Sequence, residues 1–280
     1  LTSTEALERR TVPDRLVVVG GGYIAAELAH FFGTFGSDVS IVGRRPQLLP
    51  TTDAEVGAAF TDRYADRFDV YAGYEAVAAG QSGDTISVDA RVYPEDPPAD
   101  AAELPDEVTV SGDALLLAAG RVPNSDLLDL DAAGVDTDEN GFVETDDYLR
   151  TSADGVWALG DIVGEYLLKH SANHEARTVA RNIFGEDLEP VDYTAMPYAV
   201  FASPEVAGVG AREGDLDDET AYATNVYRYE DTARGGAMKA TGFVKVIVDL
   251  EGTILGCHII GPDASSLIQE VVVAMKAGSG

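Results

Sequence analysis

Residues 15–25 read Arg-Leu-Val-Val-Val-Gly-Gly-Gly-Tyr-Ile-Ala, and this stretch decides the fold class. The apolar run at 15–19 predicts a buried parallel strand, and the apolar spacing from Tyr23 onward predicts a helix that Gly36 ends. A second short strand is predicted at 39–42. Strand, helix and strand in this order indicate a Rossmann-like, doubly wound α/β domain.

The glycine-rich turn between this strand and helix indicates a dinucleotide site. Gly20 to Ala25 fits Gly-x-Gly-x-x-Gly/Ala in the strand-to-helix context that its mechanism requires. Gly20 would allow the tight turn, Gly22 would let a pyrophosphate approach the backbone, and Ala25 would permit close packing of the helix on the strand. The helix N-terminus would supply free N–H groups and a partial positive charge. A glycine-rich turn without a ligand is the alternative.

The end of the second strand indicates which dinucleotide binds. NAD sites usually place an acidic residue there to bind the ribose 2′-OH, whereas this chain has Gly43 followed by Arg44 and Arg45. Two guanidinium groups suit a 2′-phosphate through charge-assisted hydrogen bonds. We therefore expect NADP, with NAD as the weaker candidate. A solvated surface pair is the alternative interpretation of the two arginines.

The charge balance narrows the possible partners. The 280 residues include 49 Asp and Glu against 19 Lys and Arg, a net charge of −30, and only four of the basic residues are Lys. A negative field disfavours nucleic acid and anionic membranes, and no apolar run reaches the ~20 residues that span a bilayer. The pattern is typical of a salt-adapted protein, with an ordinary acidic cytosolic protein as the alternative. No secretory signal is visible, so the predicted location is cytoplasmic.

The remaining pattern predicts alternating helices and strands. A Pro- and acid-rich segment at 93–107 is expected to be an exposed loop or a linker. The apolar run at 156–159 is expected to be a strand. The other predicted elements are helices at 53–68, 168–184 and 265–277, short strands within 70–92, and strands at 114–119, 198–201, 206–209, 242–250 and 253–260.

Several ordered motifs carry a resemblance to a known family. They are Gly20 to Glu27, Ala119-Gly-Arg-Val-Pro-Asn, Ala158-Leu-Gly-Asp and the stretch from Met196 to Gly210. Together they resemble the pyridine nucleotide–disulfide oxidoreductases over essentially the whole chain. Within that family the stretches at 166–177 and 264–269 are similar to the mycothione reductases.

The resemblance implies three domains. Residues 1–121 would form an NAD(P)-binding domain and residues 122–190 the second segment of an FAD-binding domain. Residues 191–280 would form an α+β dimerisation domain that is incomplete at its C-terminus.

The resemblance also implies roles toward NADP and FAD. Tyr23 would cover the flavin when nicotinamide is absent, with an ordinary packed aromatic as the alternative, and Glu27 would pair with a lysine near both rings. Gly120 would lie against the nicotinamide half of the cofactor. Asp161 would bind the ribityl chain of FAD, and the helix that starts at Leu168 would aim at the flavin. The implied cofactor-binding residues are Gly20, Gly22, Tyr23, Ile24, Ala25, Glu27, Arg44, Arg45, Ala76, Gly120, Gly160, Asp161, Leu168, Lys169 and His170.

Metal and thiol chemistry have little support in the sequence. His170 and His174 have the i, i+4 spacing of a metal pair, but without a third ligand we expect them to pack against the helix or the cofactor edge. The single cysteine, Cys257, matches no redox position of the family and is interpreted as a small buried hydrophobe. The redox cysteine pair and the first flavin motif of the family are not in this sequence. We therefore expect an internal segment of a longer enzyme that holds no catalytic residue itself.

The implied function is an NADPH-dependent, FAD-containing disulfide reductase that works as a homodimer. Its substrate would be a small-molecule disulfide that is mycothione-like or bis-γ-glutamylcystine-like. Dihydrolipoyl dehydrogenase and mercuric reductase are alternatives within the family, and Gly43 in place of an acid argues against the first. A nucleotide-binding or dimerisation module without catalysis is the alternative outside enzymes.

Overall fold

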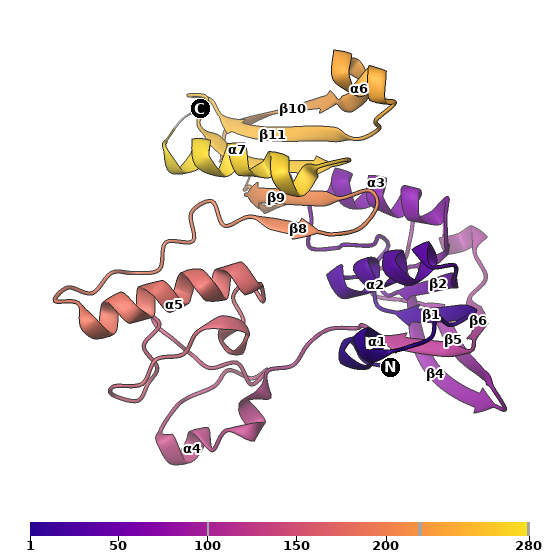
Figure 1. Ribbon diagram of the computed structural model, residues 1–280, viewed down its shortest axis with the longest axis horizontal. Helices are drawn as coiled ribbons and strands as arrows, with labels where there is room; N and C mark the ends of the chain where they lie inside the picture. The colour runs from indigo at the N-terminus through magenta and orange to yellow at the C-terminus, as the bar shows by residue number, and fades with distance from the viewer. Residues whose placement is uncertain (100, 218–219, 279–280) are drawn as a thin grey trace. The chain divides into compact units, whose positions relative to one another are not determined.

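Figure 1 shows the computed structural model, in which the chain divides into two compact units. The first unit joins residues 1–120 to the residues from Pro197 onward, and the second is Arg121–Met196. The described residues are 1–99, 101–217 and 220–278. The two outer parts of the chain therefore pack as one unit, and the predicted three-domain division stays a prediction.

A four-stranded parallel sheet carries the glycine-rich turn. Its strands are β1 (Arg15–Val19), β2 (Asp38–Gly43), β3 (Asp69–Ala72) and β7 (Ala114–Leu117), in the order β3-β2-β1-β7. The helices beside it are α1 (Ser3–Glu8), α2 (Tyr23–Thr34) and α3 (Ala54–Ala65). The predicted strand–helix–strand order is confirmed.

The two faces of the parallel sheet are covered differently because side chains alternate along each strand. Leu16 and Val18 of β1 share a core cluster with Ala29 of α2, whereas Val17 shares a second cluster with Val88. That second cluster belongs to a three-stranded antiparallel sheet, β4 (Tyr74–Ser82), β5 (Thr85–Val92) and β6 (Glu107–Gly112). One face of the parallel sheet is therefore packed by helices and the other by a sheet.

The acid-rich segment at 93–107 is a hairpin loop and not a linker, which corrects one of its two expected roles. It joins β5 to β6, and its last residue already belongs to β6. A short 3₁₀ turn, η1 (Ala101–Glu103), lies within it. The two strands are paired from Ile86 with Gly112 to Arg91 with Glu107, so the loop joins the ends of two neighbouring strands of one sheet.

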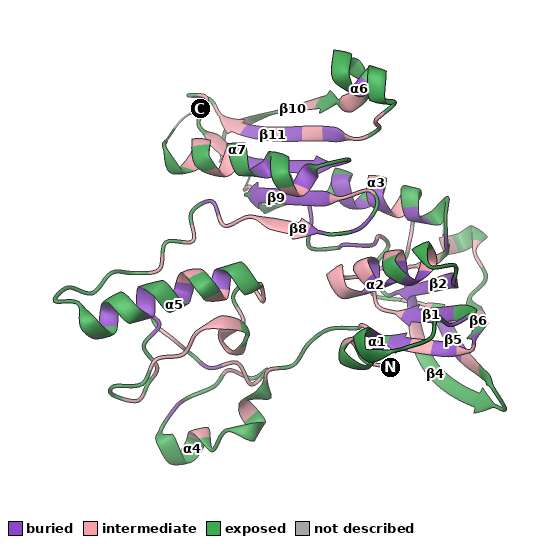
Figure 2. Ribbon diagram, viewed as in Figure 1, coloured by how far each residue is buried: buried purple, intermediate pink, exposed green. Residues whose placement is uncertain are grey.

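The C-terminal part of the first unit is a five-stranded antiparallel sheet with the order β10-β11-β12-β9-β8. Helix α7 (Ala264–Lys276) contacts β8, β9 and β12. Burial in this sheet is concentrated on β9 and β12, whereas Figure 2 shows that most of β4 in the three-stranded sheet is exposed. The strands are β8 (Tyr198–Val200), β9 (Val206–Gly210), β10 (Tyr222–Arg228), β11 (Phe243–Asp249) and β12 (Ile254–Ile260), and the short helices are η4 (Glu213–Asp215), η5 (Tyr229–Asp231) and α6 (Ala233–Met238).

The second unit is mostly irregular around one long helix. Its helices are η2 (Asn124–Leu127), α4 (Leu130–Ala133), η3 (Gly160–Val163) and α5 (Lys169–Phe184). The strand predicted at 156–159 is wrong, because this run pairs only through an isolated bridge between Trp157 and Arg150. A strand needs a continuous partner for its backbone groups, and the described residues of this unit offer none.

None of the described helices combines the length and apolar character needed to cross a membrane.

Candidate functional site

The turn between β1 and α2 contains two glycines that the fold needs for different reasons. Gly20 has a φ of +133°, and a Cβ there would lie 2.1 Å from the carbonyl oxygen of Ala118, so the backbone itself requires glycine. Gly22 has a φ of −87°, and a Cβ there would meet nothing within 4 Å. The chain's own packing does not require Gly22, and a side chain there would enter the open space at the helix N-terminus.

The first turn of α2 presents backbone N–H groups at this open space. Gly22 is the N-cap and provides no capping side chain, and the first intrahelical bond is donated by Ala26 to the Gly22 carbonyl at 3.0 Å. The N–H groups from Tyr23 to Ala25 precede that bond. Ala25 is buried and Ile24 packs on the same core. These residues fit a pyrophosphate, which needs space, donors and the positive end of a helix dipole.

The two predicted arginines lie beside this turn. Gly43 ends β2, and a Cβ on it would lie 3.7 Å from the Gly21 Cα, so the glycine turn and the strand end are neighbours. The Arg44 guanidinium lies over the Tyr93 ring, 5.2 Å from its centroid. The Arg45 Nη1 lies 3.1 Å from the Asp96 carboxylate. Both arginines are exposed, so both can reach an incoming anion.

Tyr23 and Glu27 contact β8 of the five-stranded antiparallel sheet and the residue that follows it. The Tyr23 and Tyr198 rings are 5.9 Å apart at an interplanar angle of 30°, and burial raises the pKa of the Tyr23 hydroxyl while a hydrogen bond with Thr51 offsets part of the rise. The Glu27 Oε1 accepts the Phe201 N–H at 2.9 Å. The roles implied for both residues beside a flavin stay predictions.

Two further predicted residues, Ala76 and Gly120, lie outside the parallel sheet: Ala76 is in β4, and Gly120 follows β7. Ala76 in β4 is partly buried and packs against the cluster around Val17 and Tyr74. Gly120 is the last residue of the first unit's N-terminal part; it has a φ of +142°, and a Cβ on it would meet nothing within 4 Å. At Gly120, as at Gly22, no described atom lies where a side chain would begin, so a ligand could approach the backbone there.

The predicted flavin residues of the second unit gather around η3 and the start of α5. Arg121, which sequence reasoning did not select, donates from Nη1 to Asp161 and from Nη2 to the Leu167 carbonyl, each at 2.5 Å. The Asp161 side chain remains 53% exposed, so it can still accept hydrogen bonds from a ligand. Arg121 stands in the quoted motif 119–124, which was the signal that could have found it.

The second residue that sequence reasoning missed is Glu175 in α5. It is buried, accepts the Gly160 N–H at 2.5 Å, and accepts the Tyr193 hydroxyl proton at 3.0 Å. Burial and the neighbouring Glu175 raise the pKa of Tyr193, so this hydroxyl stays protonated as a donor. Glu175 thereby fixes the backbone on which Asp161 stands.

Helix α5 begins within one residue of its predicted start. Leu168 is the N-cap, its carbonyl accepts the Ser171 hydroxyl proton at 2.7 Å, and the Lys169 ammonium donates to the Asn173 side chain. His170 is exposed, whereas the His174 Nε2 is buried without a hydrogen-bond partner among the described residues. The described part of the chain contains no group of three or more His, Cys, Asp or Glu that could hold a metal.

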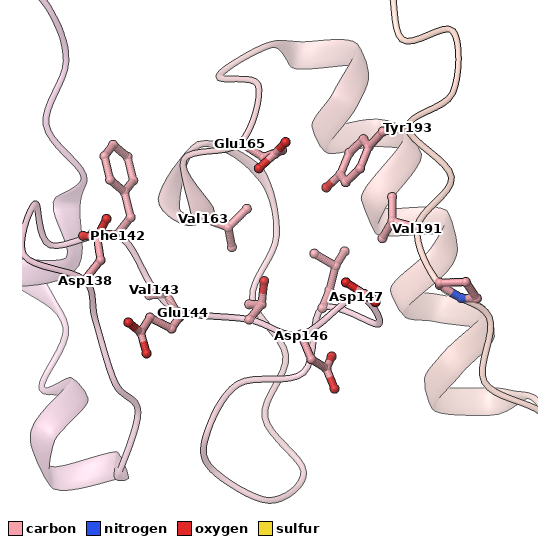
Figure 3. Close-up of a pocket in the computed structure, with 13 residues that line it drawn as sticks. Asp138, Phe142, Val143, Glu144, Asp146, Asp147, Val163, Glu165, Val191 and Tyr193 are labelled. Atoms are coloured by element: carbon pink, nitrogen blue, oxygen red, sulfur yellow. The ribbon is translucent and has the colours of Figure 1, made fainter. Parts of the chain in front are cut away.

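A cavity of about 650 Å³ lies in the second unit, and Figure 3 shows its lining side chains. Five carboxylates line it, including Glu144, Asp147 and Glu165, together with Tyr193 and apolar side chains. Among the described residues that line it there is no Lys or Arg and none of the predicted cofactor-binding residues. The cavity is therefore distinct from the residues that sequence reasoning singled out, and its charge disfavours phosphorylated ligands.

A buried ion-pair cluster, also missed, lies between α3 and β11. The Lys245 Nζ lies 2.6 Å from Glu213 and 3.2 Å from both Asp53 oxygens and from Glu55. Burial by itself lowers the pKa of Lys245, but its bonds to Glu213 and Asp53 outweigh that effect and raise it. Nothing local in the sequence indicates this contact, because Asp53 and Lys245 are 192 residues apart.

Comparisons with known proteins cover the whole chain. Residues 1–177 match the family described as "Pyridine nucleotide-disulphide oxidoreductase", and residues 196–279 match its dimerisation domain. The chain is 39% identical to a mycothione reductase of Mycobacterium tuberculosis over 99% of its own length and 59% of that protein. It is 36% identical to dihydrolipoyl dehydrogenase 3 of Haloarcula marismortui over 100% of its length and 58% of that protein.

A solved structure with a similar fold is the HOCl-induced flavoprotein disulfide reductase RclA from Escherichia coli. The TM-score is 0.86 at 26% identity, over 100% of this chain and 62% of the other. The chain thus spans about 59% of the curated mycothione reductase it matches.

Proposed function

The chain belongs to the pyridine nucleotide-disulphide oxidoreductase family, and from that premise we propose that it is part of an NADPH-dependent, FAD-containing disulfide reductase. Members of this family use FAD with NADH or NADPH. The observation that carries the proposal is the open glycine turn of α2 with Arg44 and Arg45 beside it. We also propose that the protein is located in the cytoplasm.

In the proposed nucleotide site, residues Gly20 to Ala25 hold the pyrophosphate and the two arginines hold the 2′-phosphate. The space beyond Gly22 and the N–H groups of the first turn of α2 support the first role. Exposed guanidinium groups at the end of β2 support the second role, because bidentate charge-assisted bonds suit a phosphate. Gly120 leaves open space for the nicotinamide half.

In the proposed flavin site, Asp161 would accept hydrogen bonds from the ribityl hydroxyls, and the first residues of α5 would hold the flavin ring. When bound, FAD supplies the electron transfer between a nicotinamide and a disulfide. Arg121 holds the Asp161 carboxylate in one orientation, because the same guanidinium is also bound to the Leu167 carbonyl. The partial positive charge at Lys169 and His170, the first residues of α5, stabilises negative charge nearby.

The proposed substrate is a small-molecule disulfide of the mycothione or bis-γ-glutamylcystine kind. The relative from Mycobacterium tuberculosis named mycothione reductase supports this class. Dihydrolipoyl dehydrogenase is the second candidate, because proteins of that name match the chain at 36% identity over its full length. Position 43 is Gly, whereas an NAD site usually has an acidic residue at the end of this strand. This difference favours an NADPH-dependent reductase of a small disulfide over a dihydrolipoyl dehydrogenase.

The proposed assembly is a homodimer formed through the C-terminal sheet and α7. The match of residues 196–279 to the family's dimerisation domain supports it. Leu267 and Val273 of α7 are 40% and 68% exposed, which leaves apolar surface available for a second copy.

The test uses the full-length protein with its flavin bound, in molar salt. Consumption of NADPH and of NADH is followed with three substrates: mycothiol disulfide, bis-γ-glutamylcystine and lipoamide. We expect NADPH-dependent turnover of one of the two small thiol disulfides. The variant Arg44→Glu should weaken NADPH binding by about 1–3 kcal/mol and leave NADH binding unchanged. NADH-dependent turnover of lipoamide alone would replace this proposal with the second candidate.

A further inference from the structure

The loop between β5 and β6 lies directly against the proposed 2′-phosphate site. We name residues 93–106 the acidic loop, because they include five Asp or Glu and no Lys or Arg. Gly73 connects it to the site: the Gly73 N–H donates to the Arg45 carbonyl at 2.7 Å, and the Gly73 carbonyl accepts the Tyr93 N–H at 2.8 Å. Pro98 packs on the same glycine, where a Cβ would lie only 2.6 Å from its ring.

Two side chains of the acidic loop engage the two arginines. The Asp96 carboxylate is 3.1 Å from the Arg45 guanidinium, and their side chains are 38% and 52% exposed. The Tyr93 ring lies under the Arg44 guanidinium, and its hydroxyl donates to Glu95 at 2.5 Å. Both cations that are proposed to hold the 2′-phosphate therefore already have a partner in the loop. For Arg45 that partner is itself an anion.

We propose that Asp96 is a specificity-tuning residue that competes with the 2′-phosphate of NADP for Arg45. The inference rests on the proposed function, since it needs a phosphate at the two arginines. A carboxylate and a phosphate oxygen use the same guanidinium N–H donors, so Arg45 must release Asp96 before it can bind the phosphate with that edge. NAD has no 2′-phosphate and leaves the pair intact. Asp96 thus lowers the affinity for NADP without affecting that for NAD.

Salt changes the strength of this competition. The Arg45–Asp96 pair is half exposed, and such pairs are screened as the Debye length falls from about 10 Å at 0.1 M to about 3 Å at 1 M. Added salt weakens the attraction between NADP and the arginines, but it also weakens the competitor. The affinity of the wild-type protein for NADP should therefore depend less on salt than that of a protein without the Asp96 charge.

The test measures dissociation constants of NADP⁺ and NAD⁺, which bind without reducing the flavin, for the full-length protein by calorimetry. The proteins are wild type, Asp96→Asn, Asp96→Glu and Asp84→Asn, each at 1 M salt and at the lowest salt that preserves the native circular dichroism. Asp84→Asn is the matched control, because Asp84 is exposed in the turn between β4 and β5, at the other end of the hairpin from the acidic loop, and loses the same charge.

At low salt we expect Asp96→Asn to bind NADP⁺ about twofold to fivefold more tightly than wild type, the range for an exposed pair. That gain should fade at 1 M salt and should vanish in an Arg45→Gln background, because the arginine is the shared partner. Asp96→Glu and Asp84→Asn should behave as wild type, and NAD⁺ affinity should not change. Equal NADP⁺ affinity of Asp96→Asn and wild type overturns the inference. So does an equal gain in Asp84→Asn, which would indicate only the net charge.

Failure of the proposed function gives a different result. If wild type binds NADP⁺ no more tightly than NAD⁺, the 2′-phosphate site itself is wrong and the inference falls with it. If wild type prefers NADP⁺ and Asp96→Asn changes nothing, the nucleotide assignment stands and only the role of Asp96 is refuted.

Discussion

The ammonium of Lys245 in β11 lies 3.2 Å from both carboxylate oxygens of Asp53, the N-cap of α3, and both side chains are almost fully buried. This pair joins the parallel-sheet part of the first unit, residues 1–120, to the five-stranded antiparallel sheet. Arg212 adds a second connection, because its Nη1 donates to the Thr51 carbonyl at 3.0 Å. The segment around Thr51 and Asp53, which follows the two proposed phosphate-binding arginines, is thus bound to residues of the C-terminal part of the first unit.

The first prediction concerns the stability that depends on this buried pair. Lys245→Met leaves the Asp53 carboxylate buried without its main cation, which should lower the free energy of unfolding by about 3–5 kcal/mol. Arg91→Met removes an exposed pair with Glu75 and should cost less than about 1 kcal/mol. Denaturant unfolding of both variants in molar salt checks this. Equal losses would mean that the cluster is solvated.

The second prediction separates the two glycines of the α2 turn. Gly20→Ala places a methyl group against the Ala118 carbonyl at a positive φ and should destabilise the fold by at least about 2 kcal/mol. Gly22→Ala meets no atom of the chain, so stability should change by no more than about 0.5 kcal/mol while NADP⁺ affinity falls at least about tenfold. Thermal melting and calorimetry measure the two effects. Unchanged nucleotide binding in Gly22→Ala would remove the pyrophosphate from this space.

The third prediction is a pH dependence that comes from Cys257. Burial raises the pKa of this thiol to about 12, whereas a thiol in the unfolded chain has a pKa near 8.5. Between these values the unfolded state loses a proton that the folded state keeps, so stability falls as pH rises above about 8.5. Removing the thiol should remove up to about 1.4 kcal/mol per pH unit of this slope.

The measurement compares unfolding free energies of wild type and Cys257→Ala from neutral to alkaline pH, so that contributions of other groups cancel. The variant should also keep full activity in the full-length protein, because a buried thiol with a raised pKa is a poor nucleophile. Parallel slopes for the two proteins would show that the thiol is accessible to solvent.

The fourth prediction concerns assembly and salt. A dimer would bring together two chains with a net charge of −30 each, so we expect it to be firm at molar salt and to dissociate or unfold when salt is removed. Light scattering along a salt series measures this. Val273→Asp, in the exposed part of α7, should give a monomer at molar salt. Leu250→Asp, in the exposed turn before β12, should leave the dimer intact.

Regular elements that bury one face could be predicted from the sequence. β1 shows as a continuous apolar run because both of its faces are covered, and α2 shows as a helical spacing because one face packs on that strand. β10 was missed because it is an edge strand with little buried surface. Apolar and polar residues therefore do not alternate along its sequence. The run at 156–159 is apolar without being a strand, because its pairing with the segment around Arg150 is limited to one isolated bridge.

The candidate sites divide in the same way. The glycine turn and the arginines are local in sequence, so a motif can reveal them. Asp96 reaches Arg45 across 51 residues and Lys245 reaches Asp53 across 192, and such contacts depend on the packing of separate elements. Glu175 shares this origin, since its role follows from the backbone of Gly160, 15 residues earlier.

The core of the first unit combines Leu16 and Leu116 with Val206 and Ile260. During synthesis the ribosome must add the whole second unit and most of the C-terminal sheet before the last of these side chains can join the core. Until then the face of residues 1–120 that Val206 and Ile260 later cover stays exposed to other chains, because contacts of this sequence separation form late. The order of residues along the chain therefore sets an interval during synthesis, after residue 120 and before residue 260, in which this apolar face has no cover.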